Sequence, residues 1–386
     1  MKIAIVHDYL HQYGGAEKVV EKWMEMYPQA DIYTSFYTPA KFSSSPTFET
    51  ARQENRIHTT WLQHFIPPLI KYYKHFFWLY PLVMSGLVVK DYDLVLTSST
   101  YCGKNVRYKN CGKLIHYCHS PVRFLHNLVT ETDHKTINPI FRVVIPAIKA
   151  PLKWMDLRAV DYLNKNDCIW IANSQFTQSI IKDVYHTESQ ITYPPIDLAK
   201  FLCIERDKDE TQDYYLCHGR ISFHKRLDLA INSCLKLGKK LKISGSSSFD
   251  HETNTLKKIV SDYEIDHPES AGLIEFLGRT YDEEAFELMK NCRAFLFPGK
   301  EDFGIAPIEV LAAGVPIIAY QAGGALEYIK DSINGVFFAE QSIESMCESI
   351  TNFENSFVEN TQAIRATATP FDESVFREQI SALTKD

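Results

Sequence analysis

Short apolar runs alternate along the chain with longer amphipathic stretches. Lys2–Val6 is an apolar run, a loop containing Gly14–Gly15 follows it, and apolar residues then recur at helical spacing from Ala16 onwards. A strand, a glycine-containing loop and a helix in this order are typical of a doubly wound α/β domain, in which ligands bind at the carboxyl ends of the strands. The loop lacks the G-x-G-x-x-G pattern, which argues against a dinucleotide site.

Further apolar runs predict the remaining strands. In the first half of the chain we expect strands at 32–34, 94–96, 114–118 and 168–172, with the last of these ending the first domain. In the second half we expect them at 214–218, 241–245, 274–279, 294–297 and 315–319, with helices alone after Gly335. Residues 131–165 are predicted to be helical, with Trp154, Leu157, Val160 and Leu163 forming a core stripe.

Residues 298–335 carry the densest pattern of chemistry. An apolar run ends at Phe297, and a loop with two carboxylates and two glycines follows it. Pro307 suits the first turn of a helix, and Gly314 suits the left-handed cap that ends it. Because the next strand and the Gly323–Gly324 turn repeat the arrangement, both loops are expected at one edge of a parallel sheet. Helix N-termini at such an edge present N–H groups that suit a phosphate.

Acidic and basic residues frame this expected phosphate site. Glu301 in the loop and Glu309 in the helix can grip the two hydroxyl-bearing ends of a ligand whose diphosphate lies between them. Arg220 and Lys225 follow the strand at 214–218 and can clamp a diphosphate. A sugar joined through a diphosphate to a ribose has this shape, so the residues indicate a nucleotide sugar.

The segment EDFGIAPIEVLAAGVPIIAYQAGGALEYIKDSINGVFF resembles the donor-binding E-x7-E region of retaining glycosyltransferases of family 4. EDFGI together with GGALE is similar to the GDP-mannose-dependent mannosyltransferase branch of O-antigen and capsule assembly. The resemblance implies a GT-B fold, in which two Rossmann-like doubly wound α/β domains face a cleft. It implies a domain at 1–195 that binds the acceptor, a domain at 196–370 that binds the nucleotide sugar, and a C-terminal helix at 371–386 that crosses back to the first domain.

The resemblance also assigns roles to individual residues. The HYCHSP run at 116–121 matches a motif whose histidine faces the donor sugar, which implies a catalytic role for His119. Arg220 and Lys225 would neutralise the leaving diphosphate, and Glu301 would orient the sugar. The implied donor site is made up of Gly14, Gly15, Gly219, Arg220, Lys225, Gly278, Arg279, Glu301, Phe303, Gly304, Ile305 and Glu309. The resemblance further implies a reaction that needs no metal and no cofactor beyond the donor, which would be GDP-mannose. The acceptor would be a glycan or a polyprenyl-linked sugar.

Composition and charge argue against several other classes of protein and site. A chain of 386 residues with a net charge of −7 is expected to hold two or three domains and not to bind nucleic acid. Nine irregularly spaced cysteines indicate a reducing compartment, and no leader precedes the first strand, so we expect a cytoplasmic protein. Asp91 and Asp93 form an Asp-x-Asp pattern, but they open a buried strand, and we expect no metal there.

Residues 66–89 mix lysines with aromatic residues. The segment is too short and too interrupted by Pro81 to span a membrane, but its composition suits an anionic membrane surface. Packing within the first domain is the other interpretation. Three readings of the whole chain stay open beside mannosyl transfer. They are a same-fold enzyme that uses UDP-glucose or another nucleotide sugar, a non-catalytic scaffold that binds nucleotide sugars, and, least supported, a nicotinamide dehydrogenase.

Overall fold

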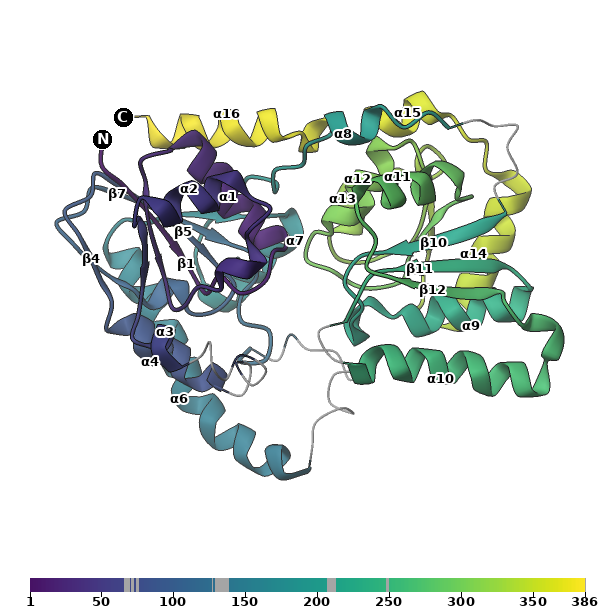
Figure 1. The fold of residues 1–386 in the computed structure, drawn as a ribbon, viewed down its shortest axis with the longest axis horizontal. Helices are drawn as coiled ribbons and strands as arrows, with labels where there is room; N and C mark the ends of the chain where they lie inside the picture. Colours follow the sequence, from purple (N-terminus) through teal and green to yellow (C-terminus); the bar gives the residue numbers. More distant parts are fainter. Residues whose placement is uncertain are drawn as a thin grey trace. The chain divides into compact units, whose positions relative to one another are not determined.

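The computed structural model describes residues 1–65, 70, 73, 76–126, 128, 139–206, 213–247 and 250–385. These residues form two compact units (Figure 1), one made of 1–195 with 374–386 and the other of 196–373. Each unit is built around a parallel sheet, so the expected α/β class with two doubly wound domains is confirmed.

Seven described strands form the sheet of the N-terminal unit, in the order β3-β2-β1-β5-β7-β8-β9. They are β1 (Ile3–His7), β2 (Asp31–Thr34), β3 (Ile57–Thr59), β5 (Leu94–Ser99), β7 (Lys113–Cys118), β8 (Ile169–Ala172) and β9 (Gln190–Ile191). Strand β1 shows how the sheet is packed. Ile3 and Ile5 belong to one buried cluster, and Ala4 and Val6 belong to another, because successive side chains point to opposite faces.

Helices cover both faces of this sheet. Helices α1 (Gly15–Met26), α2 (Pro46–Gln53) and α16 (Glu373–Thr384) supply the cluster that contains Ile3 and Ile5. The opposite cluster includes residues of α3 (Leu62–Phe65), α4 (Tyr80–Ser85) and β4 (Val88–Lys90), which pairs with β6 (Arg107–Lys109). Helices α6 (Pro139–Lys165) and α7 (Gln175–Tyr185) pack beside β8. Helix α16 therefore joins residues 374–386 to the core of the N-terminal unit, with Phe376 and Ile380 buried.

The C-terminal unit has the strand order β12-β11-β10-β13-β14-β15. Its strands are β10 (Tyr214–His218), β11 (Lys240–Ser244), β12 (Ile274–Gly278), β13 (Phe295–Phe297), β14 (Ile317–Tyr320) and β15 (Gly335–Phe338). Helices α9 (Leu227–Leu237), α10 (Asp250–Asp266) and α14 (Ile343–Ser356) share a buried cluster on one face. Helices α11 (Asp282–Asn291), α12 (Ile305–Ala312) and α13 (Ala325–Tyr328) lie on the other (Figure 1), and the short helices α8 (Ala199–Leu202) and α15 (Thr361–Ala366) complete the unit.

The strand order determines where each unit can bind a ligand. The order reverses between β1 and β5 in the first sheet and between β10 and β13 in the second. Loops that leave neighbouring strands in opposite directions open a crevice at their carboxyl ends. A ligand site is therefore expected among the residues that follow β1, β5, β10 and β13.

Three local expectations were wrong. Residues after Gly335 form a strand, β15, because that run pairs with β14 and completes the sheet. Residues 168–172 do not end the first sheet, because the short edge strand β9 pairs with β8. Trp154 is 59% exposed and lies beside Arg158 instead of in the core, whereas Val160 and Leu163 of the same stripe are buried. Residues 131–138 of the expected helix lie outside the described residues.

Segment 66–89 is described only in part. Its basic residues Lys71, Lys74 and His75 lie outside the described residues. Tyr80, Val83 and Met84 are buried in the N-terminal unit, while Trp78 and Leu82 of the same stretch are 45% and 56% exposed. No helix among the described residues is both long and apolar enough to cross a membrane.

Candidate active site

The loops that follow β10 and β13 meet in the C-terminal unit. Gly299 lies against the short helical turn 223–225, because a Cβ atom built on it would lie 2.8 Å from the Cα of Lys225. This close approach brings the ammonium of Lys225 to the carboxylate of Glu301, and the two form an ion pair with side chains 17% and 18% exposed. Lys225 and Glu301 are 76 residues apart in the sequence, but their side chains are in contact at the edge of the sheet.

A second pair of glycines allows the strand ends themselves to approach. Gly245 follows β11 with φ +148°, and a Cβ atom on it would lie 1.8 Å from the carbonyl oxygen of Gly219. Gly219, which follows β10, also has a positive φ of +123°. Only glycine avoids both the clash and the backbone strain. The chain after β10 therefore runs directly across the end of β11 towards Arg220, which is exposed.

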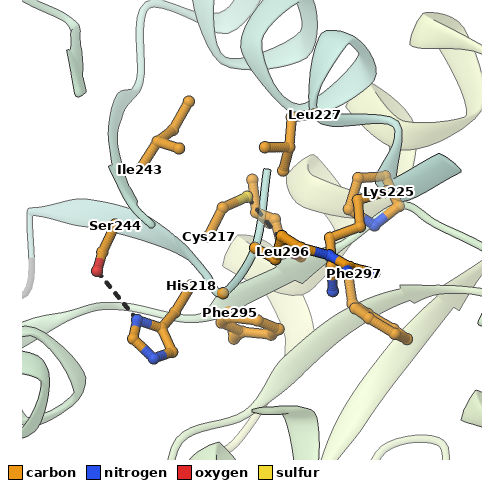
Figure 2. A pocket seen from close by; sticks show the side chains of 12 residues that line it. Cys217, His218, Lys225, Leu227, Ile243, Ser244, Phe295, Leu296 and Phe297 are labelled. Carbon is orange, nitrogen blue, oxygen red and sulfur yellow. Dashed lines mark hydrogen bonds between the residues drawn. The ribbon is translucent and has the colours of Figure 1, made fainter. Parts of the chain in front are cut away.

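A small cavity lies beneath these strand ends (Figure 2). It has a volume of about 20 Å³, and its lining includes His218, Lys225, Ser244 and Phe297. The imidazole Nδ1 of His218 lies 3.0 Å from the hydroxyl of Ser244, which lies 2.6 Å from the hydroxyl of Thr280. The ends of β10 and β11 and the residues after β12 are therefore linked by side-chain hydrogen bonds.

The loop 301–305 is held from behind by the Gly323–Gly324 turn. The N–H of Gly324 donates to the carbonyl oxygen of Glu301 at 2.9 Å, and a Cβ on Gly324 would lie 2.6 Å from the Cα of Phe303. The hydroxyl of Tyr328 donates to the carbonyl oxygen of Phe303. The loop then turns into α12 at Gly304, which has φ +94°. These contacts fix the N-terminus of α12 beside Glu301.

The other expected donor residues lie around this centre. Glu309 is half-buried on α12, with its helix beginning at Ile305. Gly278 ends β12 with φ +72°, its carbonyl oxygen accepts a hydrogen bond from the N–H of Gly245, and Arg279 beyond it is exposed. The strand β11 separates Gly278 from β10. The C-terminal unit therefore gathers the expected residues at one sheet edge, with Lys225 and Glu301 in direct contact.

The expected residues of the N-terminal unit also lie at its strand ends. The N–H of Gly14 donates to the Oε2 of Glu17 at 3.0 Å, and Gly15 begins α1. His119 follows β7 and is 8% exposed, with its Nε2 atom 2.8 Å from the Oγ of Ser98. Burial and the nearby charge of His7 lower the pKa of His119 to about 3, so the ring is neutral at pH 7.

Asp8 lies at the centre of this edge and was not expected from the sequence. Its carboxylate accepts hydrogen bonds from the backbone N–H groups of residues 100–103 and from the hydroxyls of Ser99 and Thr100. Burial alone would raise the pKa of Asp8. The positive charge of His7 and these hydrogen bonds outweigh burial and lower the pKa to about 2. Asp8 therefore ties the end of β1 to the loop after β5.

A buried ion pair lies behind this loop. The Nζ of Lys104 lies 2.7 Å from Oδ1 of Asp156, and the Nε2 of His126 lies 2.8 Å from Oδ2 of the same carboxylate. All three side chains are at most 4% exposed. The pair ties the loop after β5 and residue 126 to helix α6.

Sequence reasoning missed His7, Asp8, Glu17 and Ser98, although one signal was present. His7 and Asp8 are polar residues that directly follow an apolar strand, which is where doubly wound domains place their ligands. Lys104 and Asp156 carry no such signal, because they are 52 residues apart and neither directly follows an apolar strand. Among the described residues no group of three metal-ligating side chains gathers into a metal site.

Part of the chain matches a known family model. Residues 204–368 match the family model described as "Glycosyl transferases group 1". The matched residues include Gly219, Arg220, Lys225, Glu301 and Glu309, so the matched segment contains both loops that carry the ion pair.

Individual relatives are distant. The chain is 25% identical over 267 residues to the alpha-1,3/1,6-mannosyltransferase ALG2 of Homo sapiens, a match that covers 62% of this chain and 59% of the human protein. It is 24% identical to the ALG2 of Mus musculus, over 71% of this chain and 67% of that protein. The chain thus spans about three fifths to two thirds of the length of these two curated relatives.

Solved structures extend the likeness to the whole fold. Anabaena Alr3699/HepE in complex with UDP aligns over 99% of both chains with a TM-score of 0.68 and 17% identity. The apo form of the lipopolysaccharide outer core galactosyltransferase WaaB aligns over 99% of both chains with a TM-score of 0.63 and 14% identity. Together with the two parallel sheets, this likeness confirms the GT-B fold. The chain therefore has the GT-B fold, and residues 204–368 within it match the glycosyl transferases group 1 model.

Proposed function

We propose that the protein is a retaining hexosyltransferase that moves mannose from GDP-mannose to a hydroxyl group of a lipid-linked or oligosaccharide acceptor. The observation that carries the proposal is the Lys225–Glu301 ion pair. It puts a cation suited to a diphosphate and a carboxylate suited to sugar hydroxyls side by side, next to the N-terminus of α12 and within the segment that matches the glycosyl transferases group 1 model.

The charges support specific roles in the reaction. The bond between the anomeric carbon and the diphosphate oxygen breaks, and negative charge develops on the leaving group. Lys225, the exposed Arg220 and the N–H groups at the start of α12 would stabilise that charge, at about 3 kcal/mol for each preorganised donor. Glu301 would hold sugar hydroxyls and Glu309 the ribose. The acceptor oxygen would form the new bond on the same face of the sugar, and its proton would pass to the leaving phosphate.

Mannose is favoured as the transferred sugar by the printed names of the relatives. The chain is similar to ALG2 proteins that are named as mannosyltransferases. A UDP donor is the second candidate, because the structure of Anabaena Alr3699/HepE with similar fold contains UDP and a related one contains UDP-glucose. The structure alone favours neither base, since contacts from Gly278 and Arg279 would be made mainly by main-chain atoms.

The first experiment is thermal stabilisation by GDP, UDP, ADP and dTDP, with Glu309→Ala as the control. A ligand at one hundred times its Kd stabilises the folded state by about 2.7 kcal/mol. A shift with GDP alone that is lost in the variant supports the proposal. A shift with UDP alone would replace GDP-mannose with a UDP-sugar as the proposed donor. No shift with any nucleotide would contradict the proposal.

Transfer itself is tested with the donor that binds. Release of the nucleoside diphosphate from GDP-[14C]mannose, with and without acceptor-containing membrane extract, separates transfer from hydrolysis. Retention is read from the anomeric configuration of the product by NMR. Product of the opposite configuration would contradict the retaining mechanism.

We also propose that residues 66–89 bring the enzyme to an anionic membrane on which a lipid-linked acceptor would lie. The exposed Trp78 and Leu82 support this, together with the lysines at 71 and 74 in the sequence. Co-sedimentation with vesicles containing 30% phosphatidylglycerol, compared with pure phosphatidylcholine, tests it. Equal absence of binding to both vesicles would contradict it.

A further inference from the structure

A chain of four buried polar side chains connects the first helix of the N-terminal unit to His119. Glu17 lies on α1, His7 ends β1, Ser98 lies in β5, and His119 follows β7. The exposed fractions of the four residues are 2%, 2%, 0% and 8%. Glu17 Oε1 lies 3.7 Å from His7 Nε2, His7 Nδ1 lies 3.2 Å from Ser98 Oγ, and Ser98 Oγ lies 2.8 Å from His119 Nε2.

The polarity of the hydrogen bonds that join His7, Ser98 and His119 follows from one backbone carbonyl. His7 Nδ1 lies 3.0 Å from the carbonyl oxygen of Ser98, and a carbonyl oxygen only accepts. The Nδ1 atom of His7 therefore carries a proton and donates it to that oxygen and towards Ser98 Oγ. Ser98 Oγ accepts on this side, so its own proton must go elsewhere.

The proton of the Ser98 hydroxyl has one acceptor among the described residues. That acceptor is Nε2 of His119, and a fully buried hydroxyl keeps its hydrogen bond. The Nε2 atom of His119 therefore accepts and carries no proton. A neutral imidazole has one proton, so it must be on Nδ1. The described residues supply no hydrogen-bond partner for that Nδ1–H group.

We infer that Glu17, His7 and Ser98 are positioning residues that hold His119 as its neutral Nδ1–H tautomer, so that the ring presents a hydrogen-bond donor and not a base. The inference rests on the proposed function for the identity of the ligand, which would be an oxygen atom of the donor sugar. Tautomer control itself rests on the hydrogen bonds alone.

The charges around the ring keep it neutral. Among the described residues, the titratable groups near it include His7 and Asp8 at the end of β1, Glu17 on α1, and His116 and Tyr117 on β7. Burial alone would lower the pKa of His7, but its contact with Glu17 outweighs burial and raises the pKa. A positive His7 opposes a second positive charge on His119. Glu17 therefore acts on His119 through His7.

The test reads the tautomer directly. We expect two-bond 1H–15N spectra of the 15N-histidine-labelled full chain to show a protonated Nδ1 and a bare Nε2 for His119, unchanged from pH 5.5 to 8. The resonances are assigned from their loss in His119→Asn. A protonated Nε2, or a ring that titrates within this range, would overturn the inference.

A variant pair tests whether Ser98 is responsible. Ser98→Ala removes the hydroxyl, and the ring should then populate the Nε2–H tautomer or titrate. Ser99→Ala, which removes the neighbouring buried hydroxyl that donates to Asp8, should leave the signals of His119 unchanged. All five tryptophans lie in residues 1–195, so tryptophan fluorescence verifies that each variant is folded. An unchanged tautomer in folded Ser98→Ala would refute the role of Ser98.

Activity separates this inference from the proposed function. The amide nitrogen of asparagine overlays Nδ1 of histidine, and that of glutamine overlays Nε2. His119→Asn should therefore keep roughly tenfold more kcat/KM than His119→Gln, because one hydrogen bond to a polar ligand is retained. If the two variants have equal kcat/KM and the NMR spectra show the expected tautomer, His119 does not bind the sugar, but its tautomer is still controlled by Ser98. An inverted order with an Nε2–H tautomer would reject both.

Discussion

Lys225 and Glu301 form an ion pair between the loops that follow β10 and β13, although our proposal gives them different parts of the donor. Under that proposal the carboxylate would compete with a bound diphosphate for the same ammonium group. Lys225 would then share its charge between Glu301 and the phosphate oxygens, and each of the two residues would affect the affinity of the other for its part of the ligand.

Glu301→Gln should separate nucleotide affinity from turnover. The variant frees Lys225, so its affinity for the nucleoside diphosphate alone should rise, up to about tenfold or 1.4 kcal/mol. Turnover of the nucleotide sugar should fall by roughly 100-fold or more, because a charged contact to the reacting sugar is lost. Calorimetric titration with the diphosphate and initial rates measure the two effects. Asp213→Asn, which breaks an exposed pair with Lys240, is the control. Weaker diphosphate binding by Glu301→Gln would contradict the competition.

Lys225→Ala should weaken binding of the nucleoside diphosphate. A hydrogen bond to a charged group contributes about 1.5–3 kcal/mol, so the Kd should rise roughly 10- to 100-fold. The same titration at 50 and 300 mM salt should show a smaller salt dependence for the variant than for the natural chain. Lys236→Ala removes an exposed lysine of the same unit, paired with Glu344, and should change neither quantity. Equal Kd values for the two variants would exclude Lys225 from the diphosphate site.

Gly245→Ala should destabilise the C-terminal unit alone. Its Cβ would lie 1.8 Å from the carbonyl oxygen of Gly219, so the strand ends must separate, at a cost of about 3 kcal/mol or more. Gly238→Ala is the matched control, since it has φ +65° but no atom within 4 Å of the added Cβ, and should cost about 1–2 kcal/mol. Urea unfolding followed by far-UV circular dichroism measures both. Tryptophan fluorescence reports only on residues 1–195, and its transition should not move.

Asp8 should make the stability of the N-terminal unit depend on pH below about 4. Its folded pKa of about 2 lies below the ordinary 3.8, so the ionised group stabilises the fold above pH 4. That stabilisation is lost as the pH falls from about 4 towards 2 and the carboxylate gains a proton. The difference in the free energy of unfolding between the natural chain and Asp8→Asn should shrink by about 2 kcal/mol over this range. Urea unfolding by tryptophan fluorescence measures it, with Asp161→Asn, an exposed site on α6, as the control.

Lys104 and Asp156 should be strongly coupled. Asp156→Leu leaves the ammonium of Lys104 buried without its main partner, which should cost about 3–5 kcal/mol of unfolding free energy. The double variant Lys104→Met with Asp156→Leu removes both charges and should be more stable than Asp156→Leu alone. A double-mutant cycle by tryptophan fluorescence gives the coupling energy. Additive effects would show that the buried pair contributes nothing as a pair.

The sequence by itself determined the class of fold and most of its elements. Apolar runs such as 2–6 and 294–297 predicted the strands, because a strand buried on both faces must be apolar throughout. The hydroxyl of Ser174 caps the start of α7 by accepting a hydrogen bond from the N–H of Thr177, three residues away. Gly314 has the left-handed φ of +84° expected of the cap after α12. These features depend on neighbouring residues, so they can be read locally.

Pairing between distant segments was decided only by the tertiary structure. Strands β9 and β15 are short, and each is a strand because it pairs at a sheet edge with the preceding strand, β8 or β14, across an intervening helix. Trp154 continues an apolar stripe but faces solvent, because the stripe extends beyond the part of α6 that packs on β8. Helical spacing alone does not show which part of a helix packs against a neighbouring element and which part faces solvent.

In the candidate site, too, the sequence predicted residues, and the tertiary structure decided their contacts. The sequence named Lys225 and Glu301, but their ion pair exists because Gly299 lets two loops approach within van der Waals distance. The sequence named His119, but its tautomer depends on a hydroxyl 21 residues away and on the carbonyl oxygen beside it. Residue types are local properties of the chain, whereas hydrogen-bond polarity and ion pairing depend on distances that only the folded sheets set.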